Sequence, residues 1–77
     1  MKAEANKIIE LMKREVESFV DFDNLKMDVS LEDQGLDSLD LISTFLAITE
    51  EYGIKISDDE MDSLTTVNEI VSFINNQ

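Results

Sequence analysis

The sequence has no cysteine, no histidine and no proline, and only two glycines among its 77 residues. Without cysteine, the chain has neither a disulfide nor a thiolate nucleophile. Without histidine, it lacks a Ser-His-Asp triad and the side chain that most often serves as general base or metal ligand. We therefore expect neither independent catalysis nor a metal site. Any reactive group that the protein uses has to come from outside.

Basic side chains are also scarce. Six lysines and arginines stand against 18 carboxylates, which gives a formal net charge of −12 at pH 7. Beyond Met27, Lys55 is the only basic residue among twelve carboxylates. Solubility alone explains such charge in many acidic domains. The imbalance nevertheless excludes nucleic-acid phosphates and anionic membranes as partners, and it favours basic protein surfaces, to which binding weakens as salt rises.

Long hydrophobic runs are the last absence. No apolar stretch approaches the 18 residues of a membrane span, and the N-terminus becomes amphipathic at once instead of carrying the apolar block of a signal peptide. A cytoplasmic location is the default expectation. The length predicts a single domain over residues 1–77, and 43% hydrophobic residues suffice for a core. A monomer is the simplest oligomeric state.

The first half of the chain contains a helical pattern followed by an irregular one. Apolar residues at helical spacing predict an amphipathic helix from about Ala3 to Val20. Its buried stripe consists of Ala5, Ile8, Ile9, Met12, Val16, Phe19 and Val20. From Asp21 to Asp37 no period lasts, but scattered apolar residues predict a long connection that lies across the core. Residues 30–33 are expected to form one short helical turn within it.

A second helix is predicted to begin at Ser38 or Leu39 and to end near Tyr52, with Gly53 as its C-terminal stop. Its apolar face consists of Leu39, Ile42, Phe45, Leu46, Thr49 and Tyr52, widened by Leu41 and Ile48. A helix that is apolar over so much of its circumference is either central or presents part of its surface to a ligand or partner.

Two capping boxes in the last third of the sequence predict two further helices. Ser57 is followed three residues later by Glu60, and Thr66 by Glu69. The first box predicts a short helix over about residues 58–63, and the second a helix over about residues 67–75. The fold class is therefore all-α, with three main helices, one short helix and no strand.

A motif for chemistry stands where the long connection meets the second helix. Gly35 permits a tight turn, and Ser38 then falls at the helix N-terminus, where free N–H groups and the helix dipole favour an attached phosphate. Asp37 and Asp40 flank the hydroxyl with negative charge, which suits a phosphate installed by a basic enzyme rather than a bound free anion. The plainer interpretation makes Ser38 only a helix N-cap.

The run Gly35-Leu36-Asp37-Ser38-Leu39-Asp40 resembles the Asp-Ser-Leu attachment motif of acyl carrier proteins. The similarity extends over nearly the whole chain and includes residues 50–56 and 64–67. It implies a small four-helix acyl-carrier-like bundle in which a phosphopantetheinyl transferase esterifies Ser38 with 4′-phosphopantetheine from coenzyme A. The thiol of that arm would carry acyl groups to fatty-acid, lipid or polyketide-type biosynthetic enzymes. On this resemblance the chain is a carrier and not an enzyme.

The same resemblance implies a partner face and an acyl pocket. Asp37, Leu39, Asp40 and Glu50 match positions that recognise basic patches on the acyl-loading and acyl-using enzymes. The residues expected to shelter the acyl chain are Phe45, Leu46, Ile48, Tyr52, Ile56 and Leu64. For each of these, ordinary core packing is the competing interpretation.

The chain also departs from the pattern of many fatty-acid carriers. Ser43 and Thr49 replace acidic residues on the second helix, and Phe45 is bulkier than the aliphatic residue common at that position. These differences favour a specialised carrier with a narrower or reshaped cavity.

Three other functions compete with an acyl carrier. An aminoacyl or D-alanyl carrier protein shares the motif, and sequence separates it poorly from an acyl carrier. An unmodified acidic helical interaction module would use Ser38 only as a cap. A calcium-binding EF-hand is rejected, because Lys26 occupies the position in the segment starting at Asp21 that requires glycine.

Overall fold

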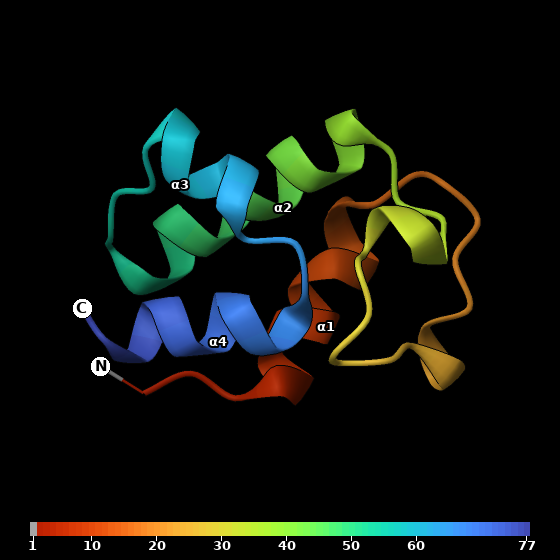
Figure 1. Ribbon diagram of the computed structural model, residues 1–77, viewed down its shortest axis with the longest axis horizontal. Helices are drawn as coiled ribbons and strands as arrows, with labels where there is room; N and C mark the ends of the chain where they lie inside the picture. Colours follow the sequence, from red (N-terminus) through yellow and green to blue (C-terminus); the bar gives the residue numbers. More distant parts are fainter. Residues whose placement is uncertain (1) are drawn as a thin grey trace.

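Helices provide all the regular structure of residues 2–77, the part of the chain that the computed structural model describes. The described residues form four α-helices, which Figure 1 labels in chain order. They are α1 (Ala5–Glu15), α2 (Ser38–Tyr52), α3 (Asp58–Ser63) and α4 (Val67–Asn75), and two single 3-10 turns, η1 (Phe22–Asn24) and η2 (Glu32–Gln34), lie between α1 and α2. Within residues 2–77 there is no strand, which confirms the predicted fold class.

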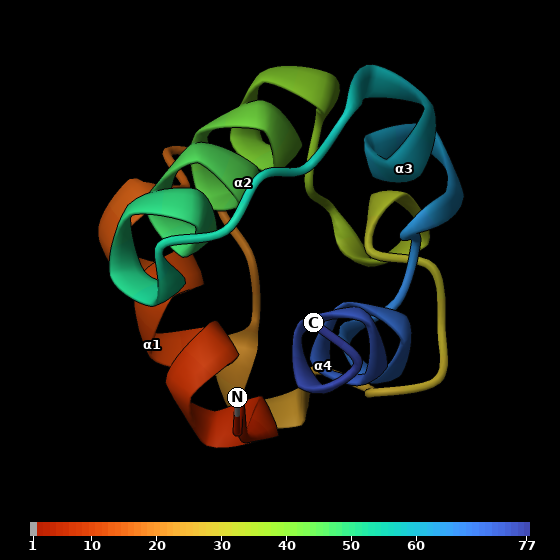
Figure 2. The same cartoon turned by 90° about the vertical axis from the view of Figure 1, so that its left-hand side faces the viewer.

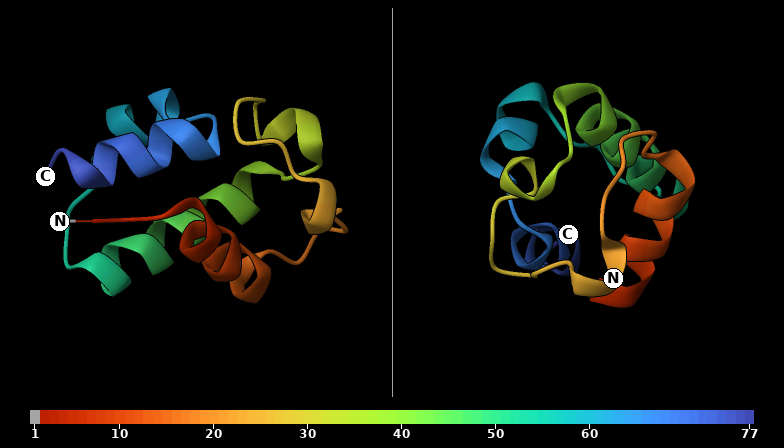
Figure 3. Two further views of the ribbon diagram at one scale, coloured as in Figure 1. Left: turned by 90° about the horizontal axis from the view of Figure 1, so that it is seen from below. Right: turned by 90° about the vertical axis from the view of Figure 1, so that its right-hand side faces the viewer.

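The helices surround one core. α1 packs against both α2 and α4. Figures 2 and 3 show α1 and α2 on one side of the molecule and α3 and α4 on the other. The long connection between α1 and α2 lies at one end, and the C-terminus lies at the opposite end beside the first described residues (Figure 1). The N-terminus of α2 is therefore at the end that the long connection covers.

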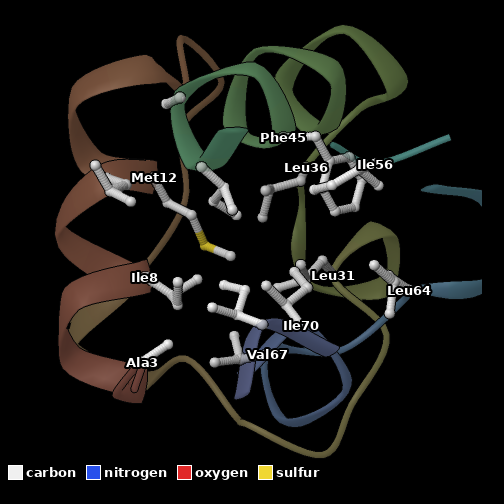
Figure 4. Packing of buried hydrophobic residues seen from close by; sticks show 14 of the residues in the cluster. Ala3, Ile8, Met12, Leu31, Leu36, Phe45, Ile56, Leu64, Val67 and Ile70 are labelled. Carbon is white, nitrogen blue, oxygen red and sulfur yellow. The ribbon is translucent and has the colours of Figure 1, made fainter. Parts of the chain in front are cut away.

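The core takes side chains from every main helix and from the long connection (Figure 4). Fully buried residues include Ile8, Leu11 and Met12 of α1, Ile48 of α2, and Val67, Ile70 and Ile74 of α4. Leu25, Leu31 and Leu36 of the connection are buried as well. The prediction that the irregular segment lies across the core is thus confirmed.

Hydrogen bonds hold the long connection to the helical part of the molecule. The Leu31 N–H donates to the Thr65 carbonyl at 2.8 Å, and the Asn68 N–H donates to the Met27 carbonyl at 3.0 Å. The Gln34 side chain accepts from the Lys26 N–H at 2.6 Å and donates to the Lys26 and Val29 carbonyls. The connection is therefore an ordered element and not a slack loop.

The C-terminus of α2 and the N-termini of α3 and α4 are capped as predicted. Both capping boxes form, and in the first the Glu60 N–H donates to the Ser57 hydroxyl at 3.2 Å while the Ser57 N–H donates to the Glu60 carboxylate at 2.9 Å. Gly53 ends α2 in the left-handed conformation, with a φ of 65°. The predicted bounds of α2, α3 and α4 are confirmed.

The predicted extent of the first helix is wrong at its C-terminal end. α1 ends at Glu15, Val16 is already extended with φ −82° and ψ 126°, and Phe19 is fully exposed instead of buried. The cause is a tertiary hydrogen bond, because the Glu17 N–H donates to the Asp40 carboxylate of α2 at 3.1 Å. If the helix had continued, the Glu17 N–H would have donated to a backbone carbonyl four residues earlier.

The predicted apolar face of α2 is also wrong, because it combines two sides of the helix. Phe45 and Ile48 are buried, together with Thr44 and Ala47. Of the remaining apolar positions, Leu41 and Tyr52 are half-buried, while Leu39, Ile42 and Leu46 are exposed. α2 therefore presents a buried side to the core and an apolar stripe to solvent.

Elsewhere, the surface is dominated by unbalanced negative charge. Among residues 2–77 the structure holds one ion pair, between the Lys7 ammonium and the Glu51 carboxylate at 3.5 Å. None of the described helices combines the length and the apolar character needed to cross a membrane.

A two-way hydrogen bond joins the two ends of the described chain. The Ala3 N–H donates to the side-chain oxygen of Asn75, and the Asn75 side-chain N–H donates to the Ala3 carbonyl at 3.2 Å. We predict that Asn75→Ala lowers the free energy of unfolding by about 1 to 2 kcal/mol, because both bonds are lost. Urea denaturation measures this change. The matched control is Asn76→Ala, whose side chain makes one long bond to Ser72; equal effects of the two variants would contradict the prediction.

Candidate functional site

The start of α2 is closed by a reciprocal capping box. Asp37 is the N-cap, and its side chain accepts from the Asp40 N–H at 2.9 Å, while the Asp37 N–H donates to the Asp40 carboxylate at 3.2 Å. Ser38 is therefore the first helical residue, with its side chain exposed. The interpretation of Ser38 as the N-cap is wrong, because an Asp one residue earlier accepts the N–H that a cap has to satisfy.

Asp40 is buried, with 5% of its surface exposed. One carboxylate oxygen accepts from the Glu17 N–H and the other from the Asp37 N–H. Hydrogen bonding by the Ser18 side chain is the main reason that the pKa of Asp40 is lowered below 3.8; burial acts in the opposite direction, and the backbone bonds lower the pKa further. Asp40 was predicted as a partner contact, but its carboxylate points inward and positions the site instead.

Gly35 makes the turn from η2 into α2. Its φ of 109° is in the region that disfavours side chains, and a Cβ there would lie 3.5 Å from the Phe19 carbonyl oxygen and 3.6 Å from the Val20 side chain. The Leu36 N–H then donates back to the Leu31 carbonyl at 3.2 Å. The chain around Ser38 is thus held against the segment that follows α1.

A cavity of about 180 Å³ lies beside Ser38, between α2, α3 and the long connection. Phe45 and Leu64 were predicted for an acyl pocket, and both line it. The lining also includes Ser30, Glu32, Ser38, Leu41, Ile42, Met61, Asp62 and Thr65. A lining that combines apolar side chains with the exposed Ser38 fits a covalently attached arm with an apolar end group.

The other predicted pocket residues are not part of this cavity. Ile48 and Ile56 are buried in the core, and Leu46 is exposed on the far side of α2. Tyr52 lies at the opposite end of α2, next to Lys7 and Glu51. Ile42 follows Ser38 by four residues, about one helical turn, so helical spacing would have identified it as a residue of the cavity lining. No local pattern indicates Met61 or Thr65, because their place follows from how α3 packs on α2.

The exposed side of α2 carries the rest of the predicted partner face. Asp37, Leu39 and Glu50 are exposed, and Leu39 keeps 72% of its surface in solvent. Ile42 and Leu46 continue the stripe at i+3 and i+7 from Leu39, with Leu46 54% exposed. An apolar stripe between carboxylates extends from Ser38 along the helix.

The role of Asp40 has a pH signature. Its folded pKa is lowered, so its contribution to stability is present above the unfolded pKa of about 4 and is lost as pH falls through the folded pKa. We predict that Asp40→Asn costs about 1 to 3 kcal/mol at pH 7 and progressively less below pH 4. Urea denaturation at several pH values measures the gap. Asp28→Asn removes an exposed carboxylate and serves as control; a gap for Asp40→Asn that does not change with pH would contradict the assignment.

Comparisons with known proteins agree with this geometry. Residues 6–74 match the family model described as a phosphopantetheine attachment site. Over 46 residues the chain is 44% identical to an acyl carrier protein of Thermosynechococcus vestitus. This alignment covers 60% of this chain and 57% of the relative. Over 47 residues it is 43% identical to an acyl carrier protein of Buchnera aphidicola subsp. Schizaphis graminum, covering 61% and 60%. The chain thus spans about three fifths of the length of these relatives. It belongs to the acyl carrier protein family, whose members carry covalently attached 4′-phosphopantetheine.

Proposed function

We propose that Ser38 carries 4′-phosphopantetheine as a phosphodiester and that the chain delivers acyl groups to biosynthetic enzymes without catalysing a reaction itself. The arm supplies a terminal thiol that holds an acyl group as a thioester. The observation that carries the proposal is the exposed Ser38 hydroxyl at the start of α2, beside a partly apolar cavity and left free by the capping role of Asp37.

The residues around Ser38 suit a phosphate there. The positive end of the α2 dipole lies at residue 38 and stabilises a negative group on the first turn. The two neighbouring carboxylates, whose negative charge opposes a phosphate, each accept a hydrogen bond from a backbone N–H in the capping box. Their charge is thereby partly offset, and Asp40 is turned into the protein.

The cavity suits a short acyl group. A cavity of about 150 Å³ in another protein accommodates benzene, so a cavity of about 180 Å³ holds roughly six to eight carbons. Phe45 forms part of the cavity wall, and only 2% of its surface is exposed. This restricted volume supports a specialised carrier rather than the housekeeping carrier of fatty-acid synthesis.

The exposed side of α2 suits basic enzyme surfaces with an apolar centre. Leu39, Ile42 and Leu46 supply apolar contact, while Asp37 and Glu50 supply charge. Acidic side chains are absent from positions 43 and 49, where Ser43 is half-buried and the Thr49 hydroxyl donates to the Leu46 carbonyl. Docking on this face would then depend more on the apolar stripe and less on charge, which again supports a dedicated set of partners.

One observation favours an aminoacyl carrier as the second candidate. Two acidic residues, Glu32 and Asp62, are among those that line the cavity. An α-ammonium group on a loaded amino acid would be attracted to them, whereas an unsubstituted acyl chain would gain nothing from them.

The attachment site is tested by intact mass. Incubated with coenzyme A and a phosphopantetheinyl transferase, the chain is expected to gain one phosphopantetheine, and Ser38→Ala is expected to gain none. Ser43→Ala, which removes a hydroxyl from the next turns of the same helix, is the control and should be modified like the wild type. If the transferase modifies a known carrier but not this chain, the unmodified interaction module becomes the better function.

The capacity of the cavity is tested with arms of different length. We load the arm from acyl-coenzyme A species with two to twelve carbons and measure the thermal midpoint of each form. The midpoint is expected to rise to about six to eight carbons and then to level off. Phe45→Leu should move the plateau to longer chains, whereas Leu46→Ala, on the exposed side, should leave it in place. A plateau that Phe45→Leu does not move would contradict the assignment of Phe45 to the cavity wall.

The second candidate is tested in the same way. If an alanyl arm stabilises the protein more than a propionyl arm does, and if Asp62→Asn removes that difference, the aminoacyl carrier is favoured.

A further inference from the structure

A shallow, open hollow lies on the surface just after α1, lined by Phe19, Val20, Asp21, Phe22 and Asp23. Phe19 is the most exposed large hydrophobic residue of the described chain. Single exposed apolar side chains are common on protein surfaces, so the significance of Phe19 lies in the second ring and the carboxylates beside it. The acyl-carrying role proposed above uses none of these five residues.

The segment holds its shape and is fixed close to Ser38. The Glu17 N–H is bound to Asp40, and the Phe19 carbonyl and the Val20 side chain lie against Gly35. Within the segment, the Phe22 N–H donates to the Val20 carbonyl at 3.0 Å, and the Asn24 side chain donates to the Asp21 carboxylate at 2.7 Å. Gly35 is three residues from Ser38, a separation of at most about 11 Å. The hollow and the hydroxyl therefore belong to the same end of the molecule.

The lining combines aromatic rings with carboxylates. Phe19 and Phe22 contribute rings, and Asp21 and Asp23 contribute negative charge. An arginine guanidinium fits both, because it stacks on aromatic faces and pairs with carboxylates in a planar arrangement. A second copy of this chain is a poor occupant, since each copy carries a net charge of −12 and only six basic residues.

We propose that this hollow receives an arginine-bearing surface of the phosphopantetheinyl transferase, an inference that rests on the proposed attachment to Ser38. Enzymes that use the finished arm act on its distal thiol, whereas the transferase has to bring its active site to the bare hydroxyl. A specific interface covers about 800 Å² of each partner, roughly a sixth of the 4821 Å² surface of this chain. A footprint of that size around Ser38 extends over the adjoining 19–23 segment.

The test is the steady-state kinetics of transfer from coenzyme A by a broad-specificity phosphopantetheinyl transferase. Phe19→Ala is expected to raise the KM for the carrier about three- to tenfold with kcat unchanged, while Phe19→Tyr, which keeps the ring, retains the wild-type KM. Asp23→Asn should raise the KM and weaken its salt dependence. Glu51→Gln removes the same charge at the other end of α2, about 20 Å from Ser38, and should change neither.

Folding and identity of the occupant are checked separately. The thermal midpoint of Phe19→Ala should match the wild type, because the side chain is fully exposed. As a second measurement, Ser38→Ala should compete with wild-type chain for the transferase, and adding Phe19→Ala should weaken that competition. Unchanged KM and unchanged competition would overturn the inference while leaving attachment to Ser38 intact. Dimerisation that Phe19→Ala abolishes, with transfer unaffected, would assign the hollow to a second copy and overturn it as well. If the wild type is not modified at all, the proposed function itself fails.

Discussion

The carboxylate of Asp40 accepts hydrogen bonds from two parts of the chain, the Glu17 N–H beyond α1 and the Asp37 N–H at the start of α2. Because this one group is shared, α1 has to stop at Glu15, and the first turn of α2 is held in one orientation. The charged carboxylate of Asp40 tolerates burial because its oxygens accept hydrogen bonds, and the same hydrogen bonds lower its pKa. The position of the Ser38 hydroxyl follows from this arrangement.

The acidic composition serves several purposes in the folded chain. Some carboxylates cap the N-termini of helices: Glu60 and Glu69 complete the capping boxes at the starts of α3 and α4. Hydrogen bonding by the Thr65 side chain is the main cause of a lowered pKa for Glu69. Many others remain exposed, with one ion pair to balance them among residues 2–77. A surface of this kind repels copies of itself and attracts basic proteins. On the proposed function, acidity would favour encounter with the enzymes that a carrier serves, and the apolar residues among the carboxylates would determine how those enzymes dock.

α2 separates three roles around its circumference. Ile48 faces the core, Phe45 reaches both the core and the cavity, and Leu39 begins the stripe that faces solvent. A helix on the surface of an ordinary small domain has only one apolar side. The second apolar side lies next to Ser38, where a carrier has to be recognised. The hollow at residues 19–23 adds a different kind of surface at the same end, one in which aromatic rings and carboxylates are mixed.

Sequence alone determined the helix type, the bounds of α2 to α4, the two capping boxes and the attachment motif, since all depend on residues within a few positions of one another. Tertiary structure decided the remainder. Periodicity counted Phe19 as core because it lies three residues from Val16, but the helix had already been ended by a bond to a residue far along the chain. Likewise, hydrophobicity cannot say which side of α2 faces the core, and so Leu46 was assigned to a pocket that Met61 and Thr65 line instead. Local signals specify elements, whereas burial and cavities depend on which elements pack together.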